Sequence, residues 1–298
     1  MAFSRQAGGC KGCRGAESDF ALAMAFQPIV DVETDTVFAY EALVRGADGA
    51  SAATLLGELT EDTRYAFDQA CRKAAIEQAV KAGILDTPAR LSINFLPNAV
   101  YSPVACIQLT LRTARATGFP TERLMFEFTE NQQLDVAHVG GIIAAYREMG
   151  FTTALDDFGA GHAGLGLLAR FTPDLIKLDM ELVRGIESSL PRRLIVEGVL
   201  RMANGMGVTV IAEGIETAAE AATLRGLGVR YLQGYHFGRP AIGALPLIEQ
   251  RSVRRAALIA PPTRATRGNS GFASRTLRRI HHAEDSNAAP PVVPPRAR

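Results

Sequence analysis

The sequence has few cysteines and no long apolar run. Four of its 298 residues are cysteine, which is too few for a disulfide scaffold in a chain of this length. No run reaches about 18 apolar residues, the length that indicates a membrane-spanning helix. Residues 1–15 also lack the apolar core of a secretory signal. We therefore expect no membrane span and no secretion, and we predict a cytoplasmic location.

A strong excess of one charge is absent as well. The 32 lysines and arginines nearly balance the 31 acidic residues, so the formal net charge of +1 says little about partners. A content of 47% hydrophobic and 21% charged residues is ordinary for a globular protein. The length fits either two average domains or one α/β barrel, because such barrels commonly reach about 250 residues.

The composition changes twice along the chain. Residues 1–20 form a polar, glycine-rich segment, which we expect to be a flexible leader. Within it, Cys10 and Cys13 have the spacing of half a zinc site or of a redox pair, but no second CxxC or CxxH accompanies them. Two interpretations stay open: a leader without such a role, or a metal or redox site completed by other ligands.

The last segment, residues 251–298, is rich in arginine, proline, serine and alanine. It cannot bury enough apolar surface to offset the entropy lost on ordering, so we predict a disordered tail. Its arginines could contact nucleic acid or an acidic membrane surface, although a solvated tail is the simpler interpretation. We predict no double-stranded nucleic acid partner.

Residues 21–250 alternate between strand-like and helix-like patterns. The expected strands cover residues 26–30, 37–41, 91–95, 124–128, 152–155, 175–178, 208–212 and 231–232. The expected helices cover residues 65–82, 106–117, 136–149, 165–170, 192–204 and 218–227, with a last one beginning around 245. This alternation predicts a modified (β/α)8 barrel. One strand should run antiparallel, because the first two are joined by a turn rather than a helix.

Acidic residues lie just after the apolar runs of several of these strands. They are Glu41, Glu127, Asp156, Asp157, Asp179 and Glu213. Buried carboxylates are costly unless a positive group gathers them, and a parallel barrel brings its strand ends to one face. The pattern therefore predicts a carboxylate-lined pocket for divalent metal and phosphate chemistry. Oxygen ligands without a nearby cysteine or histidine pair favour magnesium or manganese over zinc.

Seven short motifs lie beside these strands in a recognisable order. They are Glu41-Ala42-Leu43 with Val44-Arg45-Gly46, Ser92-Ile93-Asn94, Phe126-Glu127-Phe128-Thr129-Glu130, Asp156-Asp157-Phe158-Gly159, Asp174-Leu175-Ile176-Lys177-Leu178-Asp179, Glu213-Gly214-Ile215-Glu216-Thr217 and Gln233-Gly234-Tyr235-His236-Phe237. In this order they resemble the EAL domain family, the cyclic-di-GMP phosphodiesterases. The resemblance covers residues 21–250 and implies a modified (β/α)8 barrel with two divalent cations, Mg²⁺ or Mn²⁺, at its mouth.

The resemblance also implies roles for individual residues. One cation would be held by Glu41, Asn94, Glu127 and Asp156. Asp156 would bridge to the second cation, which Asp157 and Glu213 would also hold. Catalysis is assigned to Lys177, which would orient the attacking water, with Glu213 and Glu41. Arg45 would contact the substrate phosphate, and Gln233 would act on the substrate side through the water shell of the metal. Glu130 and Asp179 would support the loop after Asp157 and Lys177, respectively.

Each motif alone has a simpler interpretation. Glu41 or Glu127 could be a solvated or salt-bridged acid, and Asp156 with Asp157 could cap a turn. Lys177 is harder to dismiss, because a buried lysine needs a partner. The joint occurrence of the motifs in order favours a shared metal site.

The loop at residues 159–165 departs from the family pattern, because alanine, glycine and His162 stand where many active members have threonine, tyrosine and serines. His162 is interpreted as a structural substitute for tyrosine. By the resemblance, residues 160–170 are a plausible homodimer interface. Three functions remain open: hydrolysis of cyclic-di-GMP to linear pGpG, binding of cyclic-di-GMP without turnover, and regulation through a protein partner.

Overall fold

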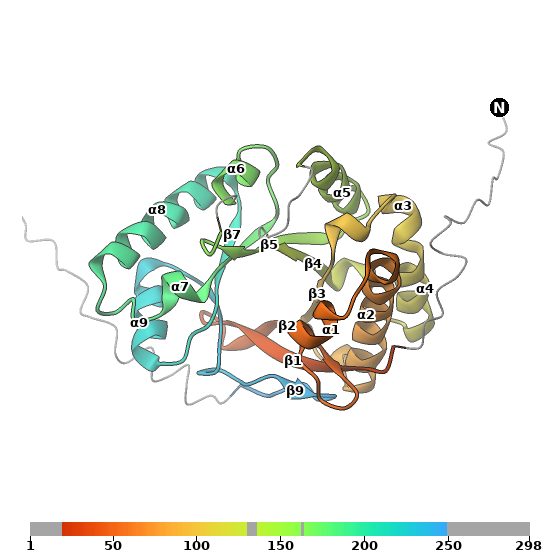
Figure 1. Ribbon diagram of the computed structural model, residues 1–298. Coiled ribbons are helices and arrows are strands. Elements are labelled where there is room, and N and C mark those ends of the chain that lie inside the picture. The colour runs from red at the N-terminus through yellow and green to blue at the C-terminus, as the bar shows by residue number, and fades with distance from the viewer. Residues whose placement is uncertain (1–19, 130–135, 162–163, 249–298) are drawn as a thin grey trace, which may run out of the picture. The chain divides into compact units, whose positions relative to one another are not determined.

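The computed structural model describes residues 20–129, 136–161 and 164–248. The leader and tail predicted at residues 1–20 and 251–298 lie almost entirely outside this part of the chain. Eight strands close a barrel, with helices outside it (Figure 1). The strands are β1 Leu22–Asp31, β2 Thr36–Gly46, β3 Arg90–Asn94, β4 Leu124–Thr129, β5 Thr152–Phe158, β6 Leu175–Leu178, β7 Thr209–Ala212 and β8 Tyr231–Gln233, and β9 Ala241–Ile242 is an extra strand on β1.

The antiparallel strand predicted from the early turn is β1. It runs antiparallel to both β2 and β8, whereas β2 to β8 are parallel to one another, so the modified (β/α)8 barrel is confirmed. The turn between β1 and β2 contains Asp35 at a left-handed φ of 56°. Asp31 accepts a hydrogen bond from the Glu33 backbone and pairs with Arg230 next to β8, which fastens this corner of the barrel.

The β1–β2 ribbon is longer than the barrel wall. The pairing of β2 with β3 ends at Ala42, but the pairing of β1 with β2 continues to Leu22 opposite Gly46. The ribbon therefore extends past the point where the carboxyl ends of the parallel strands open. It carries Glu41 where β2 still pairs with Ser92 of β3.

Helices cover the outer face of the barrel (Figure 1). They are α1 Ala52–Gly57, α2 Glu61–Lys81, α3 Pro103–Cys106, α4 Gln108–Thr117, α5 Val136–Glu148, α6 Gly164–Leu168, α7 Met180–Val183, α8 Leu190–Met206 and α9 Ala218–Leu227. The single helix expected at residues 106–117 is interrupted at Ile107. The helix expected from about residue 245 is wrong as far as Ile248, because residues 245–248 are not helical and the carbonyl of Pro246 accepts a hydrogen bond from the Tyr40 hydroxyl at 3.0 Å. No helix in the described ranges is long and apolar enough to span a bilayer.

The alternation of side chains along the strands separates two cores. Residues that point outward, such as Phe126 and Phe128 of β4, pack under the helices. Residues that point inward form a small apolar layer: Ile29, Ala39, Met125, Ala154, Leu175 and Ile211. On β2, β4, β5, β6 and β7, the residue two positions later points inward again. These residues are Glu41, Glu127, Asp156, Lys177 and Glu213. The apolar layer is therefore the floor on which the polar residues are placed.

Because this floor is closely packed, a cavity inside the barrel should lower the free energy of unfolding substantially. Met125 is fully buried in it, so we expect Met125→Ala to lower the free energy of unfolding by about 2–5 kcal/mol. Urea denaturation would measure the change. As a control, Met180→Ala removes a methionine that is 47% exposed and should change stability by less than about 0.5 kcal/mol. Equal small effects from both variants would contradict the packed floor.

Candidate metal centre

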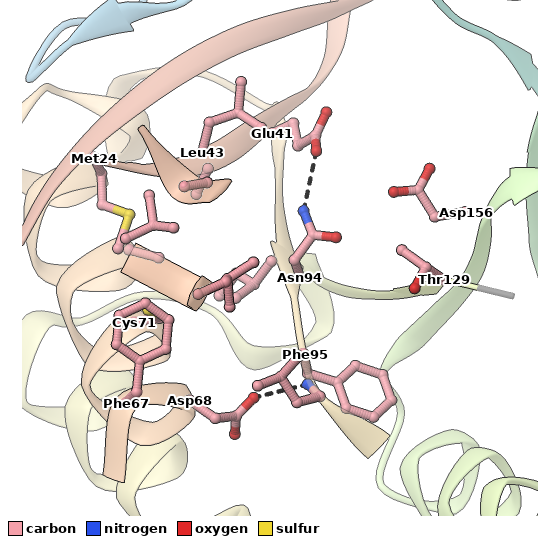
Figure 2. A pocket seen from close by; sticks show the side chains of 17 residues that line it. Met24, Glu41, Leu43, Phe67, Asp68, Cys71, Asn94, Phe95, Thr129 and Asp156 are labelled. Carbon is pink, nitrogen blue, oxygen red and sulfur yellow. Dashed lines mark hydrogen bonds between the residues drawn. The ribbon is translucent and has the colours of Figure 1, made fainter. Parts of the chain in front are cut away.

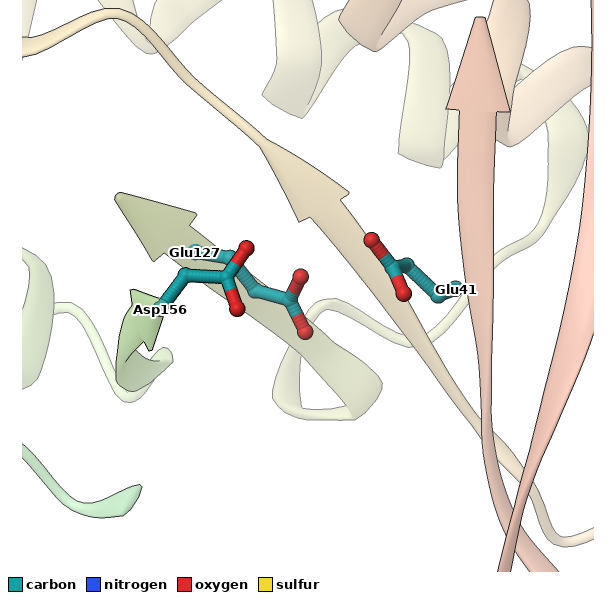
Figure 3. Close-up of side chains that lie close together, drawn as sticks. All are labelled: Glu41, Glu127 and Asp156. Atoms are coloured by element: carbon teal, nitrogen blue, oxygen red, sulfur yellow. The ribbon is translucent and has the colours of Figure 1, made fainter. Parts of the chain in front are cut away.

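Seven of the residues singled out in the sequence meet inside the mouth of the barrel. They are Glu41, Asn94, Glu127, Asp156, Lys177, Glu213 and Gln233. Carboxylate oxygens of Glu41, Glu127 and Asp156 lie within 4.8 Å of one another. Figure 3 shows these three side chains converging from separate strands. Residues more than a hundred positions apart in sequence thus form one acidic cluster.

Lys177 stands at the centre of this cluster and is fully buried. Its Nζ lies 2.7 Å from Glu127 Oε2, 2.5 Å from Glu213 Oε1, 3.1 Å from Asp156 Oδ1 and 3.5 Å from Glu41 Oε2. An ammonium has three N–H donors, so it cannot satisfy four carboxylates. Asp156 Oδ1 and Glu213 Oε1 lie close to the ammonium, but neither accepts a hydrogen bond of good geometry. One positive charge therefore leaves the cluster with an excess of negative charge.

Burial and the excess negative charge together raise the pKa values of several of these acids. Burial raises the pKa of Glu127, and the charges of Glu41 and Asp156 add to that effect, so that its pKa reaches about 8 despite Lys177. Burial likewise raises the pKa of Asp156 and raises that of Glu213 well above its usual value. Burial alone would lower the pKa of Lys177, but the surrounding carboxylates raise it, so the lysine stays charged.

Glu41 behaves differently from its neighbours. Burial favours its neutral form, but the charge of Lys177 and two amide hydrogen bonds outweigh burial, and its pKa is lowered. Gln233 Nε2 donates to Glu41 Oε2 at 2.6 Å, and Asn94 Nδ2 donates to Glu41 Oε1 at 3.0 Å. Glu41 is therefore held ionised, with both of its oxygens fixed.

The Asp156-Asp157 pair sits at an irregularity in the sheet. The pairing of β5 with β6 shifts register between Leu155 and Phe158, and Asp157 has a left-handed φ of 55°. Such a bulge redirects a side chain that would otherwise alternate to the other face. Both aspartates accordingly line the same cavity of about 430 Å³ at the mouth. Burial and the neighbouring Asp156 raise the pKa of Asp157 to about 6.

Gln233 is positioned by the glycine that follows it. Gly234 lies so close to the backbone of Ile215 that a Cβ there would overlap Ile215 O. This close approach allows Ile215 N–H to donate to Gln233 O at 3.1 Å. Any larger residue at position 234 would push Gln233 away from Glu41.

The donor set fits hard divalent cations. Glu41, Glu127 and Asp156 offer charged oxygens within one coordination sphere, and Asn94 adds an amide beside Glu41. Magnesium, manganese and calcium take ligands of this kind. Asp156 Oδ1 and Glu213 Oε1 accept no hydrogen bond, and a cation would offset both this lack and the surplus negative charge.

Two further residues hold the cluster, although the sequence motifs had assigned no role to either of them. Ser92 is buried and its hydroxyl donates to Glu127 Oε1. Gln27 Oε1 accepts from Gln233 Nε2 at 3.2 Å. Strand alternation could have found Ser92, since it lies two residues before Asn94. The position of Gln27 depends on the antiparallel register that places it opposite Glu41.

The remaining predicted residues make local backbone contacts or lie outside the described ranges. Arg45 is half-buried, and its Nη1 donates to the Val44 carbonyl at 2.7 Å. Asp179 begins α7 by accepting from the Glu181 backbone at 2.7 Å. Its role in supporting Lys177 stays a prediction, as does the substrate role of Arg45. Glu130 and His162 lie outside the residues that the structure describes.

A second cavity, of about 350 Å³, opens next to the acidic cluster. Glu41, Asn94 and Asp156 form its polar edge, and its other walls are largely apolar (Figure 2). They include Phe67 and Cys71 of α2. The residue Cys71 is half-buried, and burial raises the pKa of its thiol above the usual range.

Curated proteins with related sequences carry different functional names. The blue light- and temperature-regulated antirepressor BluF of Escherichia coli is 29% identical over 225 residues, which are 75% of this chain and 55% of BluF. The probable cyclic di-GMP phosphodiesterase PdeN of Escherichia coli is 29% identical over 235 residues, 73% of this chain and 43% of PdeN. This chain therefore spans about half of the length of these relatives.

Solved structures match the barrel closely. A standalone versatile EAL protein from Vibrio cholerae O395, bound to c-di-GMP, is 44% identical, with a TM-score of 0.75 and coverage of 78% of this chain and 98% of that one. The manganese and cyclic-di-GMP complex of Klebsiella pneumoniae BlrP1 is 33% identical, with a TM-score of 0.72 and coverage of 78% and 58%.

The family is shown by a match that covers most of the chain. The model of the EAL domain matches residues 15–240. That range contains the whole barrel from β1 to β8 and every residue of the acidic cluster. The sequence motifs, the barrel and the family match agree, and this chain belongs to the EAL domain family.

Proposed function

We propose that this chain hydrolyses cyclic-di-GMP to linear pGpG and so lowers the level of a bacterial second messenger. The observation that carries the proposal is the meeting of Lys177 with four carboxylates in the mouth of an EAL barrel. Related proteins support the substrate, since one carries the name of a cyclic-di-GMP phosphodiesterase and two were solved with this nucleotide bound.

We propose two divalent cations, Mg²⁺ or Mn²⁺, as cofactors. Glu41, Asn94, Glu127 and Asp156 would hold one of them, and Asp156, Asp157 and Glu213 the other. Bound cations would neutralise charge on the phosphoryl oxygens and lower the pKa of water at the site. The manganese complex of the Klebsiella relative supports this choice, as do the all-oxygen donors of this chain.

The residues of the chain would divide the remaining work. The buried ammonium of Lys177 would orient the attacking water by donating a hydrogen bond to it. Glu213, which lies 2.5 Å from Lys177 Nζ, would take a proton from that water as the general base. Glu41 would act in catalysis together with Lys177 and Glu213. Arg45 and Gln233 would contact the substrate, with Glu130 and Asp179 as supports.

A regulator that binds a protein partner is the second candidate. The observation that favours it is the name of BluF, an antirepressor that matches 75% of this chain. A cyclic-di-GMP receptor without turnover is the third. Incubation with cyclic-di-GMP and Mg²⁺, followed by chromatography, separates the three. Appearance of pGpG supports hydrolysis, binding without product indicates a receptor, and no binding indicates the protein-binding regulator.

We also propose a homodimer formed through residues 160–170, in the cytoplasm. Leu165 of α6 supports the interface, because its side chain is 64% exposed. Contact with a second copy would remove this apolar side chain from water.

Removal of a catalytic carboxylate should abolish turnover. We expect Glu41→Ala and Glu213→Ala each to reduce pGpG formation by at least about a hundred-fold, because even outer partners of metal ligands often cost 10–100-fold. Chromatography of the products measures the rates. Glu122→Ala is the control, since Glu122 is exposed and precedes β4 at the other end of the barrel. Retained activity in either site variant would refute its assigned role.

The raised pKa values predict how the metal-free protein responds to pH. Glu127 has a pKa of about 8 in the folded protein and an ordinary value of 4.5, so the folded state binds more protons than the unfolded state between these values. Stability of EDTA-treated protein should therefore fall as pH rises from about 4.5 to 8. Thermal unfolding across this range measures the trend.

Two comparisons isolate the cause of that trend. Glu127→Gln removes the titrating group, so the stability of this variant should depend less on pH than the stability of the unaltered chain. Saturating Mn²⁺ should raise the stability most at high pH, because cations need deprotonated ligands. Stability of the metal-free chain that rises from pH 5 to pH 8 would contradict the charge excess.

A further inference from the structure

A second buried polar cluster lies outside the barrel wall. Arg72 of α2 is fully buried, and its Nη2 lies 2.7 Å from Asp68 Oδ2, one turn earlier on the same helix. Arg72 Nη1 donates to the hydroxyl of Tyr146 in α5 at 2.9 Å. The guanidinium also lies over the rings of Phe95 and Phe126, 5.4 and 5.7 Å from their centroids. The cluster therefore joins two helices to the outer face of β3 and β4.

Asp68 extends this cluster to the metal centre. Its Oδ1 accepts from Leu96 N–H at 2.9 Å, two residues beyond Asn94, and Figure 2 marks this hydrogen bond. Between them, Phe95 N–H donates to the backbone oxygen of Glu127 at 2.9 Å. The chain that leaves β3 is thus held by Glu127 on one side and by Asp68 on the other. Asn94 itself donates to Glu41.

A contribution to stability does not by itself explain the buried ion pair of Asp68 and Arg72. A buried pair loses the hydration of both charges, and apolar replacements of similar volume are often as stable. The other oxygen of Asp68 is occupied by Arg72 and, at 3.3 Å, by Gln69 Nε2. Arg72 therefore holds Asp68 Oδ2 in place and balances the charge of the carboxylate. The other oxygen, Oδ1, accepts from the N–H of Leu96 beside the metal centre.

We propose that Asp68 is a positioning residue for the metal centre, which orients Asn94 through the hydrogen bond to Leu96 N–H. This inference rests on the proposed function, because it takes Asn94 as a ligand. Without the acceptor, the chain beyond β3 can shift, and the amide of Asn94 loses its fixed direction toward Glu41. Residues that orient metal ligands in this way commonly control metal affinity.

Two double variants separate the acceptor from the ion pair. Asp68→Asn alone would leave the charge of Arg72 buried and unpaired, so the chain could fail to fold. Asp68→Asn with Arg72→Met removes both charges but keeps an oxygen for Leu96 N–H. Asp68→Leu with Arg72→Met removes both charges and the oxygen. Mn²⁺ binding to the EDTA-treated full chain, measured by calorimetry, compares the two, with circular dichroism to confirm folding.

We expect the Leu/Met variant to bind Mn²⁺ about ten-fold or more weakly than the unaltered chain, and the Asn/Met variant to stay within about three-fold of it. Equal Mn²⁺ affinity of the two double variants would overturn the positioning role, whether both match the unaltered chain or both are weakened. Absence of Mn²⁺ binding by the unaltered chain would overturn the metal centre itself and the role of Asp68 with it. The two failures are thus distinguishable.

Discussion

Repulsion among buried carboxylates is the constraint on which this site depends. Lys177 offers one positive charge to four acids, so burial and mutual repulsion raise the pKa values of Glu127, Asp156 and Glu213. A fold that places acids so closely is compatible with stability only if they take up protons or bind cations. The same excess of negative charge that destabilises the metal-free protein would favour the binding of divalent ions.

The barrel builds this excess from a simple alternation. Each inward-facing apolar residue of the floor, such as Ala39, Met125 or Leu175, is followed two positions later by a polar one. The floor excludes water from below and keeps the local dielectric low, which strengthens every charge interaction above it. The bulge at Asp156 and Asp157 breaks the alternation at one strand and turns both carboxylates toward the mouth. The alternation of side chains along the strands therefore produces both the packed apolar floor and the polar cluster above it.

Much of this could be read from the sequence, because the motifs follow the strands in order. The barrel, its antiparallel strand and the family are confirmed. What depends on tertiary register could not be read: Gln27 reaches Gln233 only because β1 runs antiparallel. The local sequence indicates only that Asp68 is a polar residue of a helix. It does not predict that the Asp68 carboxylate accepts a hydrogen bond from the N–H of Leu96. The helix expected from about residue 245 is absent as far as Ile248, where a distant residue, Tyr40, donates to the carbonyl of Pro246.

We propose that these converging carboxylates hold two cations. Crystals grown with Mn²⁺ and measured at its absorption edge test it most directly. The account predicts two anomalous peaks about 3.5–4 Å apart, one beside Glu41, Asn94 and Glu127 and one beside Asp157 and Glu213, with Asp156 between them. A cluster that stays without Mn²⁺ at saturating concentration, with Lys177 still paired to all four acids, would contradict it.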